Sequence, residues 1–286
     1  MTEKLTVAVD GEPASDAAVA WVIDRATHVD LSLEITAVIA LNVELPQGAV
    51  SRTPYEHAVA QARASVILVH PDLPLVTNLR HGIVHDEIVA ASRRSDLLVI
   101  GSNRPSALAG MINGTLPLRV AGWAGCTTIV VPAGWRASTG RIVAGWTDDE
   151  TSDRALDFAA REAVRRKVGL TIVHAWSAPP SGSLVPSTPP SIVQDLATAH
   201  RGLLAEAVDR ITREFPELQV SHSLSSGSAS AAIIRAAAGA SLVVIGSRGR
   251  GVIASLILGS VSHDVLMTMP TVVAVIPRED HHHEPH

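Results

Sequence analysis

The chain has 286 residues, of which 47% are apolar, with a net charge of −5 and a single cysteine, Cys126. No apolar run approaches the roughly 20 residues of a membrane span, and no basic run offers a surface for nucleic acid. A single cysteine excludes an intramolecular disulfide and fits the reducing cytoplasm. The length fits two domains. We expect no signal peptide.

The first half alternates short apolar runs with helical patterns. Strands are expected at 5–9, 33–39, 74–79, 97–100 and 127–131, and helices at 15–26, 55–69, 86–93 and from about 114. Strands that alternate with helices favour a parallel α/β sheet with right-handed crossovers.

Residues 133–140 have the composition of a linker, and the alternation then starts again. Strands are expected at 141–146, 170–176, 218–224, 242–245 and 271–276, and helices at 153–168 with Ser152 as cap, 192–213, 229–238 and from 260. The Pro-, Ser- and Gly-rich stretch 177–191 is interpreted as a surface loop. The sequence therefore predicts one domain at 1–134, a second at 140–278 and a disordered tail at 279–286.

A glycine motif occurs once in each half, at a constant spacing of 145 residues. The second half has Gly246-Ser247-Arg248-Gly249, nine residues, then Gly259-Ser260-Val261; the first half has Gly101-Ser102-Asn103-Arg104, nine residues, then Gly114-Thr115. Each motif follows a buried strand and opens a helix, so backbone N–H groups and a hydroxyl can form an anion site. The spacing matches neither the dinucleotide fingerprint nor the P-loop.

Both halves resemble the universal stress protein family in its tandem two-domain form, over nearly the whole chain. The resemblance rests on the second-half motif, on residues 7–11 and 170–176, and on the strands that end at Pro132 and Pro277. It implies a doubly wound, Rossmann-like domain in each half, with five parallel strands in the order 3-2-1-4-5. It also implies ATP, with or without Mg²⁺, at the carboxyl ends of strands 1 and 4, where the strand order reverses.

The family's last strand commonly pairs two domains about a two-fold axis. Here the strands at 127–131 and 271–276 would pair within one chain, which would cover two exposed sheet edges. The resemblance thus implies an intramolecular pseudo-dimer, and a homodimer of such chains stays open.

Transferred residue by residue, the family's site differs between the two halves. The adenine-facing aspartate is Asp10 in the first half, but Thr147 holds the aligned place in the second. The adenine would also lie against backbone near Val38 or Ala175. The first half has Arg104 where a glycine is expected. That arginine either blocks close backbone approach or pairs with phosphate, and we favour the phosphate contact.

The sequence favours a nucleotide-binding regulator of the stress response over an enzyme. Neither Lys4 nor Lys167 lies near a glycine motif, and the chain has no nucleophile elbow, zinc motif or P-loop, so we assign no catalytic residue or metal ligand. A slow ATPase or nucleotide hydrolase, and a cyclic-AMP-binding protein, are the alternatives.

Other conspicuous side chains are interpreted as structural. Trp21, Trp146, Trp176 and Cys126 are expected in the core or pocket wall, and His174 as a hydrogen-bonded core histidine. His81 and His85 flank a predicted turn and are expected to be exposed.

Overall fold

The computed structural model describes residues 2–40, 52–103, 115–177, 189–247 and 258–278. The strands of the first half are β1 (Glu3–Ala8), β2 (Leu31–Ala40), β3 (Leu75–Gly82), β4 (Leu97–Ser102) and β5 (Thr127–Pro132). Those of the second are β6 (Ile142–Trp146), β7 (Leu170–Trp176), β8 (Val220–Ser226), β9 (Leu242–Gly246) and β10 (Val272–Ile276).

The helices follow the strands in regular alternation. The first half has α1 (Pro13–Ala26), α2 (Thr53–Val69), α3 (Val84–Ser92) and α4 (Thr115–Trp123). The second has α5 (Glu150–Arg166), α6 (Pro190–Glu214), α7 (Ala229–Ala236) and α8 (Ser260–Thr268). None of the helices in the described ranges is long and apolar enough to cross a membrane.

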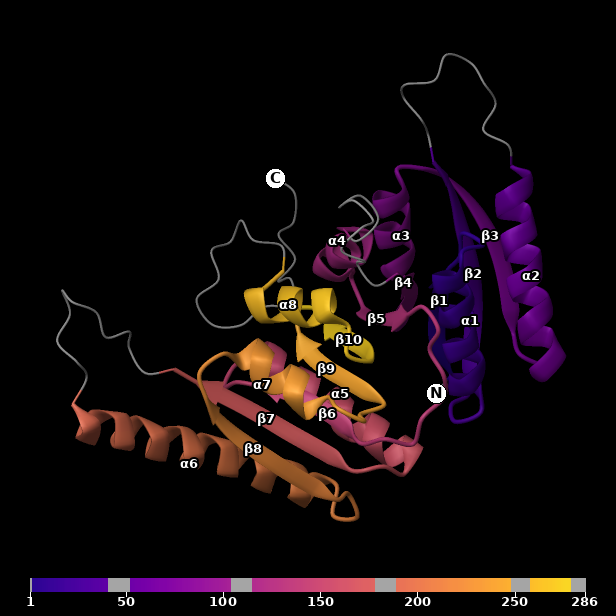
Figure 1. Cartoon of the computed structure of the whole chain (residues 1–286). Coiled ribbons are helices and arrows are strands. Elements are labelled where there is room, and N and C mark those ends of the chain that lie inside the picture. Colours follow the sequence, from indigo (N-terminus) through magenta and orange to yellow (C-terminus); the bar gives the residue numbers. More distant parts are fainter. Residues whose placement is uncertain (1, 41–51, 104–114, 178–188, 248–257, 279–286) are drawn as a thin grey trace, which may run out of the picture.

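The strands form one continuous sheet, in the order β3-β2-β1-β4-β5-β10-β9-β6-β7-β8 (Figure 1). Strands are parallel within each half, whereas β5 and β10 pair antiparallel, with Ile129 opposite Ala274. Each half therefore has the predicted order 3-2-1-4-5, and the predicted pairing of the last strands within one chain is confirmed.

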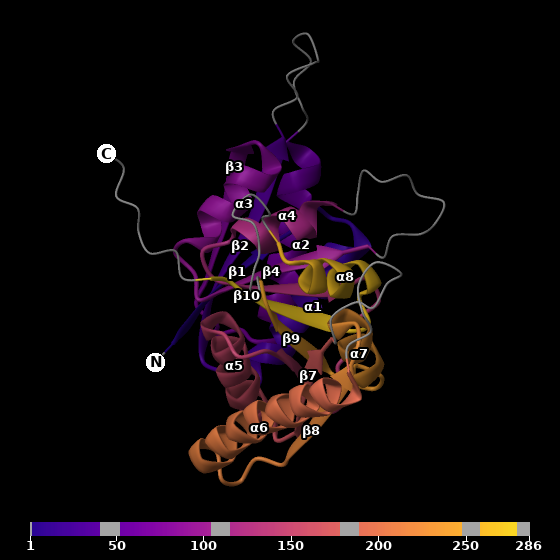
Figure 2. The ribbon, with the colours of Figure 1, turned by 90° about the vertical axis from the view of Figure 1, so that its left-hand side faces the viewer.

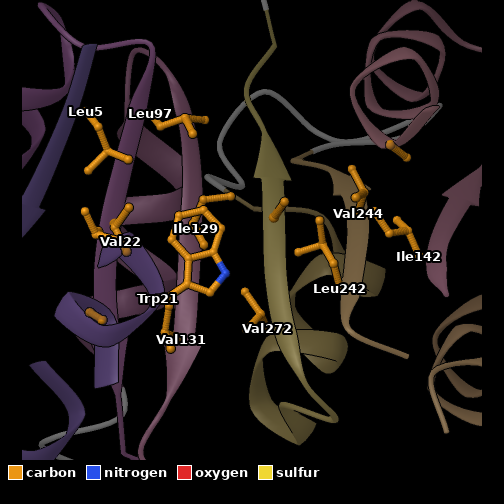
Figure 3. Packing of buried hydrophobic residues seen from close by; sticks show 14 of the residues in the cluster. Leu5, Trp21, Val22, Leu97, Ile129, Val131, Ile142, Leu242, Val244 and Val272 are labelled. Atoms are coloured by element: carbon orange, nitrogen blue, oxygen red, sulfur yellow. The ribbon is translucent and has the colours of Figure 1, made fainter. Parts of the chain in front are cut away.

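Helices cover both faces of this sheet (Figure 2). One apolar cluster includes residues of α1, α2, α5 and α6, and the other includes residues of α3, α4, α7 and α8. Both clusters continue across the junction of the halves. Figure 3 shows Trp21 of α1 beside Ile129 and Val131 of β5, toward Val272 of β10. The apolar core is therefore continuous between the two halves.

Three local predictions were wrong. The N-cap of α5 is Asp149, whose extended backbone lets its carboxylate accept a hydrogen bond from the Ser152 N–H; Ser152 lies inside the helix. Strand β3 continues to Gly82 along β2, past the apolar run that marked it. His85 is buried at 8% exposure, although the predicted exposure of His81 is confirmed.

Candidate functional site

A cavity of about 440 Å³ lies where several strands of the second half end. We call it the second-half cavity. The described residues that line it come from the ends of β6, β7 and β9 and the starts of α7 and α8: Gly145, Trp146, Thr147, Ser152, Val173, Ala175, Ser177, Ala229, Ile233, Ile245, Gly246, Gly259, Ser260, Val261 and Ser262. The cavity therefore lies at the point where the strand order reverses, as predicted for ligand sites of such sheets.

Backbone hydrogen bonds hold the start of α8 against the end of β9. The Ser247 N–H donates to the Ile276 carbonyl at 2.8 Å, and the Gly259 N–H donates to the Ser247 carbonyl at 2.8 Å. The buried Ser262 hydroxyl donates to the Gly246 carbonyl at 2.7 Å. The first turn of α8, with its backbone N–H groups, is consequently fixed at the cavity wall.

Small residues keep the cavity open beside α7. A Cβ atom on Gly145 would lie 2.4 Å from the Cδ1 of Ile233, so the glycine lets α7 approach the end of β6. Ala175 and Ala229 leave further space on the same side. The result is a hollow with both polar and apolar walls and a helix N-terminus at one side. That combination suits a ligand with an apolar ring and an anionic group.

A histidine pair supports the cavity from the other face of the sheet. Nδ1 of His174 lies 3.0 Å from the Trp146 carbonyl, and its Nε2 lies 2.9 Å from Nδ1 of His200. Because a carbonyl can only accept, His174 donates from Nδ1. Trp176 stacks on His200 with ring centroids 5.5 Å apart. The prediction of a hydrogen-bonded core histidine is confirmed, and the pair ties the ends of β6 and β7 to α6.

In the first half, larger side chains stand at the positions that align with the lining of the second-half cavity. The residues aligned by the repeat spacings are Ala8 for Gly145, Val38 for Ala175, Val84 for Ala229 and Leu116 for Val261. All four first-half residues belong to, or pack against, one apolar cluster. At the end of β4, a Cβ on Gly101 would lie 2.1 Å from the Ala14 carbonyl oxygen, so the start of α1 rests directly on this glycine.

The predicted binding residues fall into three groups. Thr147, Ala175, Gly246, Gly259, Ser260 and Val261 line the second-half cavity, and the buried Ser247 adjoins it. In the first half, Gly101 lies in β4, Val38 and Ser102 are buried, and Thr115 begins α4. Arg104, Gly114, Arg248 and Gly249 lie outside the described residues.

Asp10, the predicted adenine-facing carboxylate, is exposed. Its Oδ1 accepts a hydrogen bond from the Glu12 N–H at 3.0 Å, which is the role of a turn residue. Sequence reasoning missed Gly145, Ala229 and Ile233, which shape the cavity; only their apolar periodicity marked them, and this did not distinguish a pocket from a core.

The described side chains that line the cavity are uncharged. None of the described residues that line it carries an ionisable side chain. Elsewhere in the described part of the chain, no group of three His, Cys, Asp or Glu residues could hold a metal ion. These residues can offer a ligand backbone N–H groups, small polar and apolar side chains, and the dipole of α8.

Comparison with known proteins gives the family. The sequence model of the universal stress protein family matches residues 1–132 and again residues 139–277. The chain belongs to the universal stress protein family. A universal stress protein of Mycolicibacterium smegmatis is 28% identical over 286 residues, covering 95% of this chain and 96% of the relative. A universal stress protein of Mycobacterium tuberculosis is 27% identical over 303 residues, covering 96% of each.

Solved structures share the fold of this universal stress protein. The crystal structure of a universal stress protein from Archaeoglobus fulgidus matches 96% of this chain and 98% of that one, with a TM-score of 0.64 and 19% identity. A putative universal stress protein from Pseudomonas aeruginosa matches 96% of this chain and 93% of its own, with a TM-score of 0.64 and 17% identity. The tandem arrangement is therefore found over the full length of other members.

Proposed function

We propose that this universal stress protein binds an adenine nucleotide, ATP in the first instance, in the second-half cavity. The bound nucleotide would act in the stress response by shifting the conformation of the protein or its choice of partners. The observation that carries the proposal is the start of α8, held at the cavity wall by the bonds from Ser247, Gly259 and Ser262.

The phosphates fit the α8 side of the cavity. The first turn of a helix carries backbone N–H groups without intrahelical partners, and the helix dipole places partial positive charge there. The Ser260 hydroxyl, which is exposed at the first position of α8, adds a donor. Gly246 and Gly259 lack the side chains that would keep a phosphate away from the backbone.

The adenine fits the apolar side. Val173, Ala175, Ile233 and Ile245 supply that wall, and the volume of about 440 Å³ falls within the roughly 300–1,000 Å³ of small-molecule sites. At the aligned positions of the first half, the larger Ala8, Val38 and Val84 stand in place of Gly145, Ala175 and Ala229. We therefore place the ligand in the second half, at one nucleotide per chain.

Binding is favoured over catalysis by the same lining. Hydrolysis needs a group that positions or deprotonates water, and no described lining residue has an ionisable side chain. Mg²⁺ would be carried in by the phosphates, since the described residues form no metal cluster of their own.

Titration calorimetry with ATP tests the proposal. We expect one ATP per chain, and loss of binding in Gly259→Val, because a branched side chain would project beside the phosphate position. The backbone of Gly259 is extended, a conformation that valine also adopts. Gly202→Val, on the α6 surface with no atom near its Cβ position, is the matched control and should bind normally. Unaltered ATP binding by the Gly259 variant would refute the site, and competition by cyclic AMP would identify the cyclic nucleotide as the ligand.

A further inference from the structure

The two halves meet around a pseudo-two-fold axis that two contacts locate. A residue can touch its own counterpart in the other half only where the axis passes. In the sheet, Ile129 pairs with Ala274, which is its counterpart at the spacing of 145 residues. On the helices, Arg25 of α1 bonds Glu162 of α5, and these residues are counterparts at the spacing of 137 that relates β1 to β6.

The contact between Arg25 and Glu162 is buried and bidentate. Nη1 of Arg25 lies 2.8 Å from Oε2 of Glu162, and Nη2 lies 2.9 Å from Oε1. Each side chain is only 2% exposed. Nε and Nη2 of the same guanidinium donate hydrogen bonds to the two carboxylate oxygens of Glu3, at 2.6 and 2.9 Å.

Two further arginines of α5 extend this cluster of charges. Nη1 of Arg165 lies 2.8 Å from Oε1 of Glu162. Arg166 of α5 bonds Asp24 of α1 at 2.8 Å, which is a second ion pair between the halves. The guanidinium of Arg25 also lies over the Trp21 ring, 5.4 Å from its centroid. Every formal charge in this cluster has an opposite charge beside it.

Both axis contacts join unlike residues. A pair of two first halves would place one Arg25 guanidinium against another and one Ile129 against another. A pair of two second halves would oppose two Glu162 carboxylates and two Ala274 methyl groups, which are too small to fill the same space. Like charges facing each other in a buried contact are strongly unfavourable, and so is a buried charge without its partner.

From these contacts we infer that the surface formed by α1, α5, β5 and β10 accepts only the opposite half of this protein. The complementary charges of Arg25 and Glu162 and the complementary sizes of Ile129 and Ala274 select the unlike pair. The linker at 133–140 keeps the two partners at high effective concentration, so the pairing takes place within one chain. Association between whole chains must use other surfaces.

Charge exchange across the axis tests this inference in the full-length protein. All variants carry Glu3→Gln and Arg165→Gln, so that the reversed groups meet no second like charge. Arg25→Glu and Glu162→Arg are compared, singly and together, by hydrogen exchange at the β5–β10 ladder and by light scattering. Each single reversal should speed exchange in that ladder about 100-fold, since breaking a buried pair is strongly destabilising. The double exchange should restore protection to within about tenfold of the background.

Arg210→Glu is the control reversal. Arg210 bonds Asp157 at 2.5 Å and Asp153 at 3.3 Å within the second half, so its reversal should leave the β5–β10 ladder protected. Should a reversed chain fail to fold, the cycle is repeated with Arg25→Gln and Glu162→Gln. The double variant should then lose less protection from exchange in the β5–β10 ladder than the two single variants lose in sum. The inference is overturned if the double exchange protects no better than the single reversals, if a single reversal leaves exchange unchanged, or if Glu162→Arg forms a dimer joined through like halves.

Discussion

Ala175→Val would place the side chain of the first half, Val38, in the second-half cavity. It adds two methyl groups to a wall that lines open space. At roughly 0.8 kcal/mol per buried methyl group, the ligand-free protein should gain up to about 1.5 kcal/mol. The same groups should weaken ATP binding on the order of 10–100-fold, because overpacking a site by a methyl group or two costs ~1–3 kcal/mol.

Thermal unfolding without nucleotide and calorimetric titration with ATP measure the two effects. A gain of that size corresponds to a rise of roughly 3–6 °C in the unfolding temperature. The reciprocal variant Val38→Ala is the matched control, because Val38 is buried in the apolar cluster. It should destabilise by about 1–3 kcal/mol and leave ATP binding unchanged. An Ala175→Val protein that is less stable, or that binds ATP as tightly as before, would refute the view of this cavity as the nucleotide site.

Three further predictions concern buried groups. Thr128→Val should raise the free energy of unfolding in urea by about 1 kcal/mol, because the buried Thr128 hydroxyl has no hydrogen-bond partner. The counterpart of Thr128 in the second half, Val273, is already a valine. A loss of stability would contradict this prediction. Burial would by itself raise the pKa of Glu162, but hydrogen bonds and charge from Arg25 outweigh it and hold this pKa below its usual range. The resulting stability is present above the unfolded carboxyl pKa near ~4.3 and lost as the pH falls through the lower folded value, so acid unfolding should be shallower in Glu162→Gln. Burial raises the pKa of the Cys126 thiol to about 12, so a thiol reagent at pH 8 should modify it only as fast as the protein opens.

The alternation of apolar runs and helical patterns predicted a parallel α/β sheet in each half, and the resemblance to the family implied the strand order 3-2-1-4-5. Each half has five short buried strands separated by helices, and such a chain has few right-handed solutions. The repeat spacing also identified Pro132 and Pro277 as equivalent strand ends. The pairing of β5 with β10 was predicted from the resemblance to the family and from the two sheet edges that it covers. The glycine motif indicated where the ligand-sized cavity would lie, because Gly246 and Gly259 mark the points where the chain leaves β9 and enters α8.

What the sequence hid depends on contacts between distant segments. Arg25 and Glu162 stand in helices where charged residues are usually solvated, and only the packing of α1 on α5 buries them. Asp149 and Ser152 are both good cap residues, and the choice between them follows from how the chain leaves β6. The aligned positions of the two halves differ by four modest changes, such as Val38 for Ala175, and each alone looks like ordinary core variation.

The antiparallel junction of β5 and β10 gives the molecule a polarity. Because strands run parallel within each half, the carboxyl ends of the first half and those of the second face opposite borders of the ten-stranded sheet. The second-half cavity lies at one border, and the first-half residues that align with its lining lie at the other. A reporter group attached near the start of α8 would therefore sense nucleotide, and one at the same place on α4 would serve as a built-in reference on the same chain.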